Sequence, residues 1–482
     1  MNLPPRIPPS VIEEGLRLGD EILHTGRHLT VRSPFTGQQV GQVAMASVDH
    51  VRRAMSIAHG FRSTLSRHAR AQILNGAAAL LKARAETASD LITMESGLSK
   101  RDSRYEIGRV IDVLGFGATE TLRDDGQVFS CDLTPHGKRR KVITMREPLQ
   151  GVITAITPFN HPMNQVAHKV VPSIATNNRM VLKPSEKVPL SAYFFAELLY
   201  EAGLPREMLQ VVTGDPREIV DELLLHPHVD LITFTGGVAI GKAIAARAGY
   251  RRTVLELGGN DPLIVMDDAD LDRASDLAVQ GSYKNSGQRC TAVKRMLVHE
   301  AVKERFTELV VEKTLAWRHG DPMDERNLMG TVIDVAAAQR LQDVVNEAVA
   351  QGARVLAGHR REGALYAPTV LENVRPEMTV VRSETFGPVS PILGFKTIDE
   401  AIALANGTAF GLSSGVCTNR MDDAIRFAQE LHVGTVNVWE VPGYRIELTP
   451  FGGIKDSGLG HKEGVQEAMK SFTNTKTFTM PW

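Results

Sequence analysis

The chain has 482 residues, which is too long for one simple hydrophobic core, so two or three structural units are expected. Hydrophobic residues make up 43% of it and charged residues 23%, as in an ordinary globular protein, and a net charge of -1 favours neither nucleic acid nor an anionic membrane as a partner. No apolar stretch is long enough to span a bilayer, and Met1–Arg6 lacks the basic start and apolar run of a secretory signal, so a cytoplasmic protein is expected.

The first elements in chain order are helices, followed by one strand. Helical spacing runs from about Val48 to Arg123, in a stretch rich in Ala, Leu, Arg and Glu. Lys141–Arg146 then alternates as a strand does. The basic run Lys138–Lys141 is interpreted as a solvated strand or loop.

From residue 151 onward, short apolar strands alternate with helical segments. The first strands are expected at Gly151–Thr157, Arg179–Lys183, Met208–Thr213 and Leu231–Phe234. A second alternating region runs from about Leu263 to Val436, with strands at Leu263–Met266, Arg295–Val298 and Val389–Phe395. Because this alternation is typical of parallel β-α-β units, we expect an α/β protein with two doubly wound domains, whose ligands bind beyond the carboxyl ends of the strands.

Phe234–Ala243 follows an expected strand and opens a helix. It nearly matches a phosphate-binding P-loop, but Ala243 stands where that loop needs a hydroxyl for Mg²⁺. A dinucleotide-binding turn fits better, because glycines let backbone N–H groups approach a pyrophosphate at the start of a helix. A tight turn without a ligand would have the same pattern, so these glycines alone are weak support.

Three cysteines occur, Cys131, Cys290 and Cys417, without a CxxC pair or metal-ligand spacing, so neither a disulfide framework nor a metal site is indicated. A lone cysteine is usually a buried, inert hydrophobe, which is the expectation for Cys131 and Cys417. Cys290 differs, because it stands in a polar, glycine-containing segment directly after Arg289. We expect an accessible thiol with a lowered pKa there.

Two further side chains stand at the ends of expected strands. Glu256 precedes a Gly-Gly turn and is either a solvated loop residue or a general base. Asn160 lies between Pro158 and Pro162, which restrict the backbone and would aim its amide at one point. The alternative for Asn160 is an ordinary turn residue.

Together these motifs resemble the aldehyde dehydrogenase superfamily, in the family's order and over nearly the whole chain. The matching pieces are Thr157–Asn160, Lys183–Glu186, Phe234–Gly236, Glu256–Gly259, Gly287–Cys290, Glu384–Pro388 and Pro450–Gly453. One such motif would be weak support for the resemblance, whereas seven motifs in the same order identify the chain as a member of the superfamily.

The resemblance implies covalent catalysis. Cys290 would add to an aldehyde carbonyl, and the amide of Asn160 and the backbone N–H of Cys290 would stabilise the oxyanion. Hydride transfer to a nicotinamide would leave a thioester, and Glu256 would activate the water that hydrolyses it to a free acid. Lys169 belongs to the same expected catalytic set.

The resemblance also implies a nicotinamide coenzyme. Lys183 and Glu186 would hold the adenosine ribose, and Glu384 the nicotinamide ribose. Since the carboxylate of Glu186 would repel a 2′-phosphate, NAD is expected rather than NADP. The other expected coenzyme-binding residues are Ile156, Thr157, Pro158, Phe159, Ser185, Gly214, Phe234, Thr235, Gly236, Gly237, Leu257 and Phe386.

Departures from the common family pattern indicate an anionic substrate. Arg289 precedes the nucleophile and His161 follows Asn160, and arginine matches phosphate-like oxygens through bidentate charged hydrogen bonds. Alternatively, each arginine pairs with a neighbour such as Glu106 or Glu447. The expected substrate-binding residues are Arg109, His161, Arg289, Arg445, Thr449 and Phe451.

Within the superfamily, Gly287–Arg295 resembles the non-phosphorylating glyceraldehyde-3-phosphate dehydrogenases, but the whole set is closer to the phosphonoacetaldehyde dehydrogenases. Phosphonoacetaldehyde is therefore the expected substrate, with glyceraldehyde 3-phosphate second and lactaldehyde-like or sulfoacetaldehyde substrates still open. Glu256 argues against a CoA-acylating enzyme, because a water-activating base would waste the thioester. Retention of Cys290, Glu256 and Asn160 together argues against a non-enzymatic structural relative.

By the same resemblance, residues 1–128 and 149–257 form an NAD-binding domain and residues 258–463 a catalytic domain. Residues 129–148 and 464–482 form an oligomerisation arm. The strand edges of this arm need a partner subunit, so a homodimer or homotetramer is expected.

Overall fold

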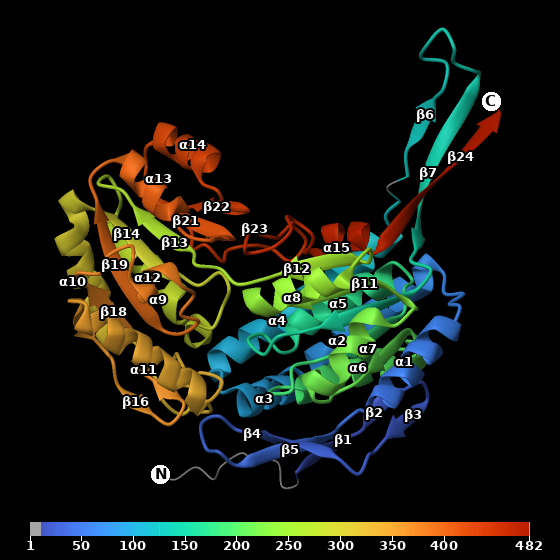
Figure 1. Ribbon diagram of the computed structural model, residues 1–482, viewed down its shortest axis with the longest axis horizontal. Helices are drawn as coiled ribbons and strands as arrows, with labels where there is room; N and C mark the ends of the chain where they lie inside the picture. The colour runs from blue at the N-terminus through green and yellow to red at the C-terminus, as the bar shows by residue number, and fades with distance from the viewer. Residues whose placement is uncertain (1–10, 125, 482) are drawn as a thin grey trace.

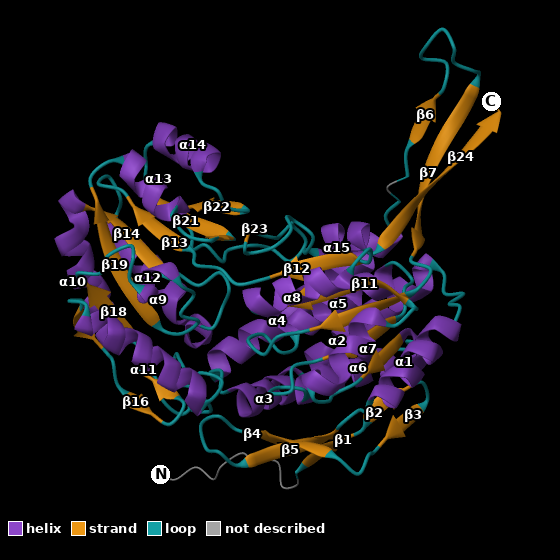
Figure 2. Cartoon of the chain, in the orientation of Figure 1, coloured by secondary structure: helices purple, strands orange, loops and turns teal. Residues whose placement is uncertain are grey.

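The computed structural model describes residues 11–124 and 126–481, so Met1–Arg6 and Trp482 lie outside the described residues. Two seven-stranded sheets form the two halves of the molecule, and a three-stranded arm projects from one of them (Figure 1). Helices pack against both sheets (Figure 2). The expected α/β class with two Rossmann-like sheets is confirmed.

The first sheet has the strand order β12-β11-β8-β9-β10-β2-β3, and its five central strands are parallel. The four strands expected here are confirmed with slightly different ends. Because helices cover the sheet, these four strands are buried along nearly their whole length. The strands are β8 (Val152–Ile156), β9 (Met180–Lys183), β10 (Leu209–Val211), β11 (Val229–Thr235), β12 (Arg252–Glu256), β2 (Leu16–Leu18) and β3 (Glu21–Leu23).

The expected helical region consists of four helices that begin at serine caps or at a sharp bend. Ser47, Ser66 and Ser99 each accept a hydrogen bond from a backbone N–H in the first turn of the helix that follows. The helices of this half are α1 (Val48–Gly60), α2 (Arg67–Ala83), α3 (Ala85–Ser96), α4 (Lys100–Leu122), α5 (Asn164–Ala175), α6 (Leu190–Glu201), α7 (Pro216–Leu225) and α8 (Val238–Ala248). A three-stranded sheet of β1 (Ile12–Glu14), β5 (Gln39–Ala44) and β4 (His28–Arg32) precedes them.

The second sheet has the order β15-β18-β19-β14-β13-β21-β22, and all its neighbours except β15 and β18 are parallel. Its strands are β13 (Pro262–Val265), β14 (Arg295–His299), β15 (Arg354–Ala357), β18 (Thr369–Glu372), β19 (Val389–Phe395), β21 (Ser413–Cys417) and β22 (Thr435–Val438). Its helices are α9 (Leu271–Tyr283), α10 (Glu300–Ala316), α11 (Val335–Ala350), α12 (Thr379–Arg382), α13 (Ile398–Asn406) and α14 (Met421–Glu430). Two small pairs complete this half, β16 (Arg361–Glu362) with β17 (Leu365–Tyr366) and β20 (Phe410–Gly411) with β23 (Ile454–Lys455).

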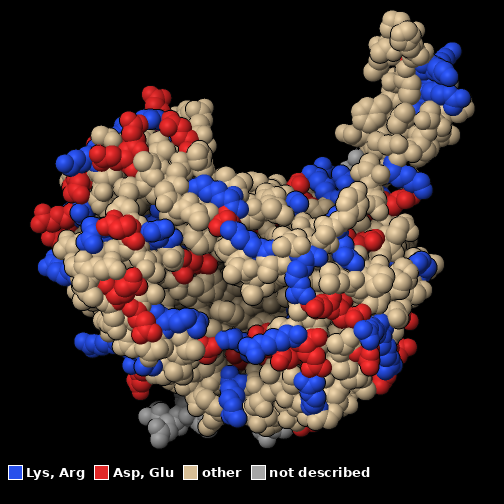
Figure 3. Space-filling view, in the orientation of Figure 1, with Lys and Arg blue, Asp and Glu red and all other residues tan. Residues whose placement is uncertain are grey.

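The arm is a ribbon in which β7 (Arg140–Pro148) pairs antiparallel with β6 (Val128–Ser130) and with β24 (Thr473–Pro481). Before β24, α15 (Val465–Ser471) packs on α5. The basic residues 138–140 are exposed on the arm, as expected of a solvated loop (Figure 3).

Cys131 also lies on the arm, and the expectation that it is buried is wrong. It is only partly buried, because no second layer covers the ribbon there, whereas Cys417 in β21 is fully buried as expected. None of the described helices is both long and apolar enough to cross a membrane.

Candidate active site

The site forms where the carboxyl ends of the first sheet meet the segment that precedes β14, and Figure 3 shows a hollow between the two halves. Glu256 is the last residue of β12, and the two glycines of the following turn lie against the nucleophile segment. A Cβ on Gly259 would lie 2.4 Å from the carbonyl oxygen of Cys290. Only glycine therefore allows Glu256 and Cys290 to be brought together in this way.

The turn before Cys290 has a rare backbone conformation. Asn285, Ser286 and Gly287 have consecutive φ values of 54°, 55° and 70°, in the left-handed region. Asp102 on α4 accepts the backbone N–H of Asn285 at 2.9 Å, and the side-chain amide of Asn285 reaches the carbonyl of Asn160 at 3.2 Å. These bonds hold the turn and tie the Asn160 segment to the nucleophile segment.

The Cys290 thiol is only partly buried, but its surroundings do not lower its pKa. Burial raises the pKa to about 11, and the charges of Lys294 and, less strongly, Arg445 oppose that rise. The expected lowering beside Arg289 is wrong, because the guanidinium of Arg289 points elsewhere and donates to the carbonyl of Gly281 at 2.7 Å. The resting thiol is therefore protonated near neutral pH.

The side chain of Asn160 is buried, and its amide has no hydrogen-bond partner within the described part of the chain. It is thus free to bind a substrate oxygen. Its neighbour His161 is buried as well, and burial is the main reason why the pKa of His161 is lowered. The amide of Asn285 lies 3.0 Å from Nδ1 of His161, and the carboxylate of Glu106 lies 3.6 Å from the same atom.

Glu256 is buried, and neither of its carboxylate oxygens has a hydrogen-bond partner among the described residues. Burial and then the nearby charge of Glu463 raise its pKa well above the ordinary value, while Lys169 opposes the rise. Lys169 donates to Glu463 at 2.9 Å and to the hydroxyl of Thr235 at 2.7 Å. The sequence named Lys169 but missed Glu463, which stands ten residues beyond the last recognised motif.

Glu447 is a buried residue whose carboxylate lies close to three basic side chains on the expected substrate side. Its carboxylate pairs with Arg109 and with His168, and Nη2 of Arg445 lies 3.7 Å from it. Pairing of the arginines with a neighbouring carboxylate, the alternative to a free anion pocket, thus applies to Arg109 and Arg445. The two arginines nevertheless share one carboxylate, and the guanidinium of Arg445 stacks on the ring of Phe451 at 3.8 Å.

Arg289 has no such carboxylate in hydrogen-bond contact. Its buried Nε atom, like the buried Nη1 atom of Arg445, has no hydrogen-bond partner in residues 11–124 and 126–481. Thr449 at the edge of this region is exposed, and its hydroxyl donates to the carbonyl of Ile446 at 2.9 Å.

The expected coenzyme-binding residues of the first sheet all lie at or just beyond the carboxyl ends of β8 to β12. Lys183 donates to Glu186 at 3.0 Å, and Gly237 begins α8 without a side-chain cap, so N–H groups of its first turn face outward. These residues fit a dinucleotide.

On the second half, Glu384 accepts the N–H of Gly259 at 3.0 Å, and a Cβ on Gly258 would lie 2.2 Å from its carboxylate. The rings of Phe159 and Phe386 meet edge to face, 5.8 Å apart. The glycine pair after β12 therefore contacts both the coenzyme side and the nucleophile side of the site.

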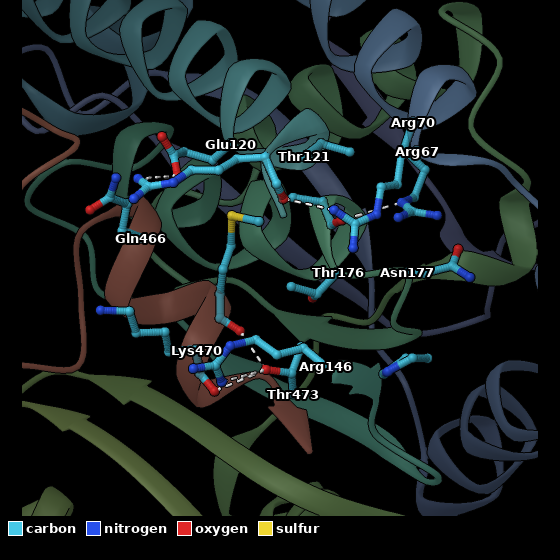
Figure 4. Close-up of a pocket in the computed structure, with 14 residues that line it drawn as sticks. Arg67, Arg70, Glu120, Thr121, Arg146, Thr176, Asn177, Gln466, Lys470 and Thr473 are labelled. Carbon is cyan, nitrogen blue, oxygen red and sulfur yellow. Dashed lines mark hydrogen bonds and ion pairs between the residues drawn. The ribbon is translucent and has the colours of Figure 1, made fainter. Parts of the chain in front are cut away.

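A separate cavity of about 240 Å³ lies at the base of the arm, walled by Arg70, Arg146 and Lys470 among others (Figure 4). Its basic residues already bind acceptors of the chain itself. Arg70 donates to the carbonyls of Leu65 and Ala175, and Lys470 to Glu467. None of the predicted site residues lines this cavity.

Residues 23–478 match the aldehyde dehydrogenase family. The chain is 41% identical over 412 residues to a sulfoacetaldehyde dehydrogenase of Neptuniibacter caesariensis (85% of this chain, 90% of the relative). It is 38% identical over 471 residues to a 3-sulfolactaldehyde dehydrogenase of Priestia aryabhattai (98% of each). The structure of the NADP-dependent glyceraldehyde-3-phosphate dehydrogenase of Bacillus halodurans, complexed with NADP, superposes with a TM-score of 0.94 at 35% identity (98% of this chain, 99% of that chain).

Solved structures of this fold include NAD-dependent and NADP-dependent enzymes. The match to the family extends over the parallel strands of the first sheet, the second sheet and most of the arm, and it includes every motif at the site. The chain is therefore a member of the aldehyde dehydrogenase family and an enzyme that oxidises a small aldehyde with NAD or NADP.

Proposed function

We propose that this chain oxidises a small anionic aldehyde with NAD through a thioester on Cys290, and that phosphonoacetaldehyde is its substrate. The unpaired guanidinium atoms carry the proposal. Arg109 and Arg445 share the single carboxylate of Glu447, and buried nitrogens of Arg289 and Arg445 have no partner among the described residues. Burying a cation without acceptors is costly, and a tetrahedral oxyanion would supply them.

The charges of the arginines influence the nucleophile and the expected base. Burial and the charge of Asp102 have the largest effects on the pKa of Arg289, and the charges of Arg109 and Cys290 have smaller ones. The charge of Arg445 lowers the pKa of Cys290 and that of Glu256, although burial has the largest effect on both. An anion bound by Arg289 and Arg445 would place an aldehyde carbonyl two carbons away near the thiol.

The chemistry follows from these residues. The thiol of Cys290 gives its proton to water and its sulfur adds to the aldehyde carbon, while the Asn160 amide and the Cys290 N–H stabilise the oxyanion. A nicotinamide whose ribose is held by Glu384 would accept the hydride released when the oxyanion collapses, and the loss of that hydride would leave a thioester on Cys290. Glu256 then takes a proton from water, the hydroxide displaces the sulfur, and the acid and the thiol are released.

Glu186 supports the choice of NAD. Lys183 and its neighbours keep the pKa of Glu186 below the ordinary value despite burial, so its carboxylate is ionised and would repel a 2′-phosphate. We expect kcat/KM to be on the order of tenfold higher with NAD than with NADP. Comparable kcat/KM values for the two coenzymes would contradict this choice.

An aldehyde with a sulfonate group is the second candidate, because the two relatives above are named for such substrates. A phosphonate carries more negative charge than a sulfonate near neutral pH. Arg109 and Arg445 share one carboxylate, and Arg289 has none in hydrogen-bond contact, although the charge of Asp102 acts on it. We take this arrangement as support for the more highly charged phosphonate.

The test is kcat/KM for phosphonoacetaldehyde, sulfoacetaldehyde, glyceraldehyde 3-phosphate and neutral lactaldehyde, on the wild type and on Arg289→Ala. The loss of a phosphonate contact should cost on the order of 2 kcal/mol, or about 30-fold in kcat/KM. The neutral aldehyde should be nearly unaffected. Equal losses for neutral and anionic aldehydes would overturn the anionic pocket, and a wild-type preference for sulfoacetaldehyde would replace the phosphonate by the sulfonate.

A further inference from the structure

Lys294 is a buried cation at the centre of the site to which no role has yet been given. It stands four residues after Cys290, directly before β14, and is 1% exposed. Its Nζ lies 2.6 Å from the carbonyl oxygen of Arg289 and 3.4 Å from those of Cys290 and Gly259. It also lies 3.4 Å from the carboxylate of Glu384.

The shortest of these contacts acts on a particular peptide group. The carbonyl of Arg289 and the N–H of Cys290 belong to the same peptide, whose resonance couples the two ends. A charge-assisted hydrogen bond to the oxygen draws electron density from the nitrogen, so the N–H becomes a stronger donor. Within the described chain that N–H has no hydrogen-bond partner of its own.

We propose that Lys294 is a positioning residue that strengthens the oxyanion hole through the Arg289–Cys290 peptide. The proposal rests on the nucleophile role proposed for Cys290. The ammonium does not reach the substrate oxygen. It holds the Arg289–Cys290 peptide in place and polarises the N–H of Cys290, which is the donor that reaches the substrate oxygen. Through its contact with Glu384 it also links this donor to the coenzyme-binding side.

Other groups near Lys294 fit this role. Its four hydrogen-bond partners are all oxygen acceptors, and the ring of Phe386 lies 5.6 Å from Nζ, within cation–π range. In this dry setting a single positive charge influences its neighbours more than it would in water.

The test compares two reactions of Cys290 that need neither coenzyme nor aldehyde. Alkylation by iodoacetamide is a displacement that forms no oxyanion, whereas acylation by p-nitrophenyl acetate passes through a tetrahedral oxyanion. Lys294→Met should lower the rate of acylation about tenfold more than the rate of alkylation. Peptide mass spectrometry identifies the modified cysteine, since Cys131 is also partly accessible.

Lys294→Gln keeps a hydrogen-bond donor without the charge and should give an intermediate ratio, and it serves if the methionine variant does not fold. Arg295→Met is the matched control. Arg295 is the adjacent buried cation and binds the carbonyls of Asn260, Leu404 and Ala405 instead. This control should lose stability but keep the wild-type ratio of the two rates.

Equal losses of acylation and alkylation in Lys294→Met, or no loss of either, would overturn the proposal. A parallel change in Arg295→Met would do the same, because it would show a general effect of lost packing. If wild-type Cys290 is neither acylated nor alkylated, the nucleophile role itself fails, which is a distinguishable result.

Discussion

Glu256 and Glu463 are both buried, yet their pKa values move in opposite directions. Burial would raise the pKa of Glu463, but the charge of Lys169 and its hydrogen bond to Glu463, with smaller contributions from His168 and Arg445, together outweigh burial and lower that pKa. Glu256 has no hydrogen-bond partner among the described residues, so burial and the charge of Glu463 raise its pKa. A carboxyl group of this kind is protonated at low pH and acts as a base only after losing its proton.

This difference predicts the pH dependence of thioester hydrolysis. The single-turnover rate of hydrolysis should rise with pH as Glu256, whose pKa is raised, loses its proton. Glu256→Gln should lower this rate by about 10²- to 10⁴-fold and remove its rise with pH. Rapid-quench measurement of the acyl-enzyme at a series of pH values tests both statements.

Replacing either member of the Lys169–Glu463 pair should shift the pH dependence of hydrolysis, and the two shifts should have opposite directions. Lys169→Met removes a charge that lowers the pKa of Glu256, so the rise should move to higher pH. Glu463→Gln removes a charge that raises it, so the rise should move to lower pH. Shifts in the same direction for both variants would exclude Glu256 as the titrating group.

At the level of elements, the turn after β12 joins three parts of the site. Gly258 faces the carboxylate of Glu384, whereas Gly259 faces the backbone carbonyl of Cys290. The end of a flexible side chain can yield to an added methyl group, but a backbone carbonyl held by other bonds cannot. Neighbouring glycines therefore have different consequences when replaced.

Gly258→Ala should fold normally and bind NAD more weakly, by on the order of tenfold, because the displaced carboxylate would lose the charge-assisted bonds that we propose it makes to the ribose. Gly259→Ala should instead impair acylation of Cys290 and lower the melting temperature. Coenzyme titration, thiol acylation and thermal unfolding of both variants separate the two outcomes. Identical behaviour of the two would contradict the assigned contacts.

Seven parallel strands of the two sheets could be predicted because parallel strands under helices are mostly apolar, as Val152–Ile156 and Pro262–Val265 are. The motif residues at the strand ends could be recognised from the resemblance to the family. Glu463 could not, since its role depends on Lys169, which lies 294 positions earlier. Lys294 offered a signal that was missed, since a lysine beside a buried apolar strand is rare unless it is paired.

Two expectations about cysteines are wrong because the local sequence does not fix the surroundings of a side chain. Arg289 and Cys290 are adjacent in sequence, but their side chains diverge, and burial then controls the pKa of the thiol. Cys131 is of a residue type that is usually buried, but it lies on a ribbon that has no second layer.

For the molecule as a whole, the arm is the feature that indicates self-association. Val128, Ile143 and Phe478 form one row across its three strands, and Val128 and Phe478 are 63% and 40% exposed. Apolar side chains beside open strand edges indicate a surface that another subunit covers. We propose a homodimer or homotetramer on this basis.

The double variant Val128→Asp/Phe478→Asp should dissociate the assembly, because it places charges on both sides of Ile143. Light scattering after size-exclusion chromatography measures the mass of each species. Leu315→Asp, at a 72% exposed position of α10, is the control and should keep the wild-type mass. A monomeric wild type would exclude the proposed assembly.

The pairing of Lys169 with Glu463 also has a consequence for biosynthesis. A ribosome that has passed residue 290 has made the thiol, but the carboxylate that completes the Lys169 pair is added only near the end of the chain, shortly before α15 docks on α5. In a nascent chain Lys169 therefore stays without its carboxylate partner until nearly the whole sequence has been made.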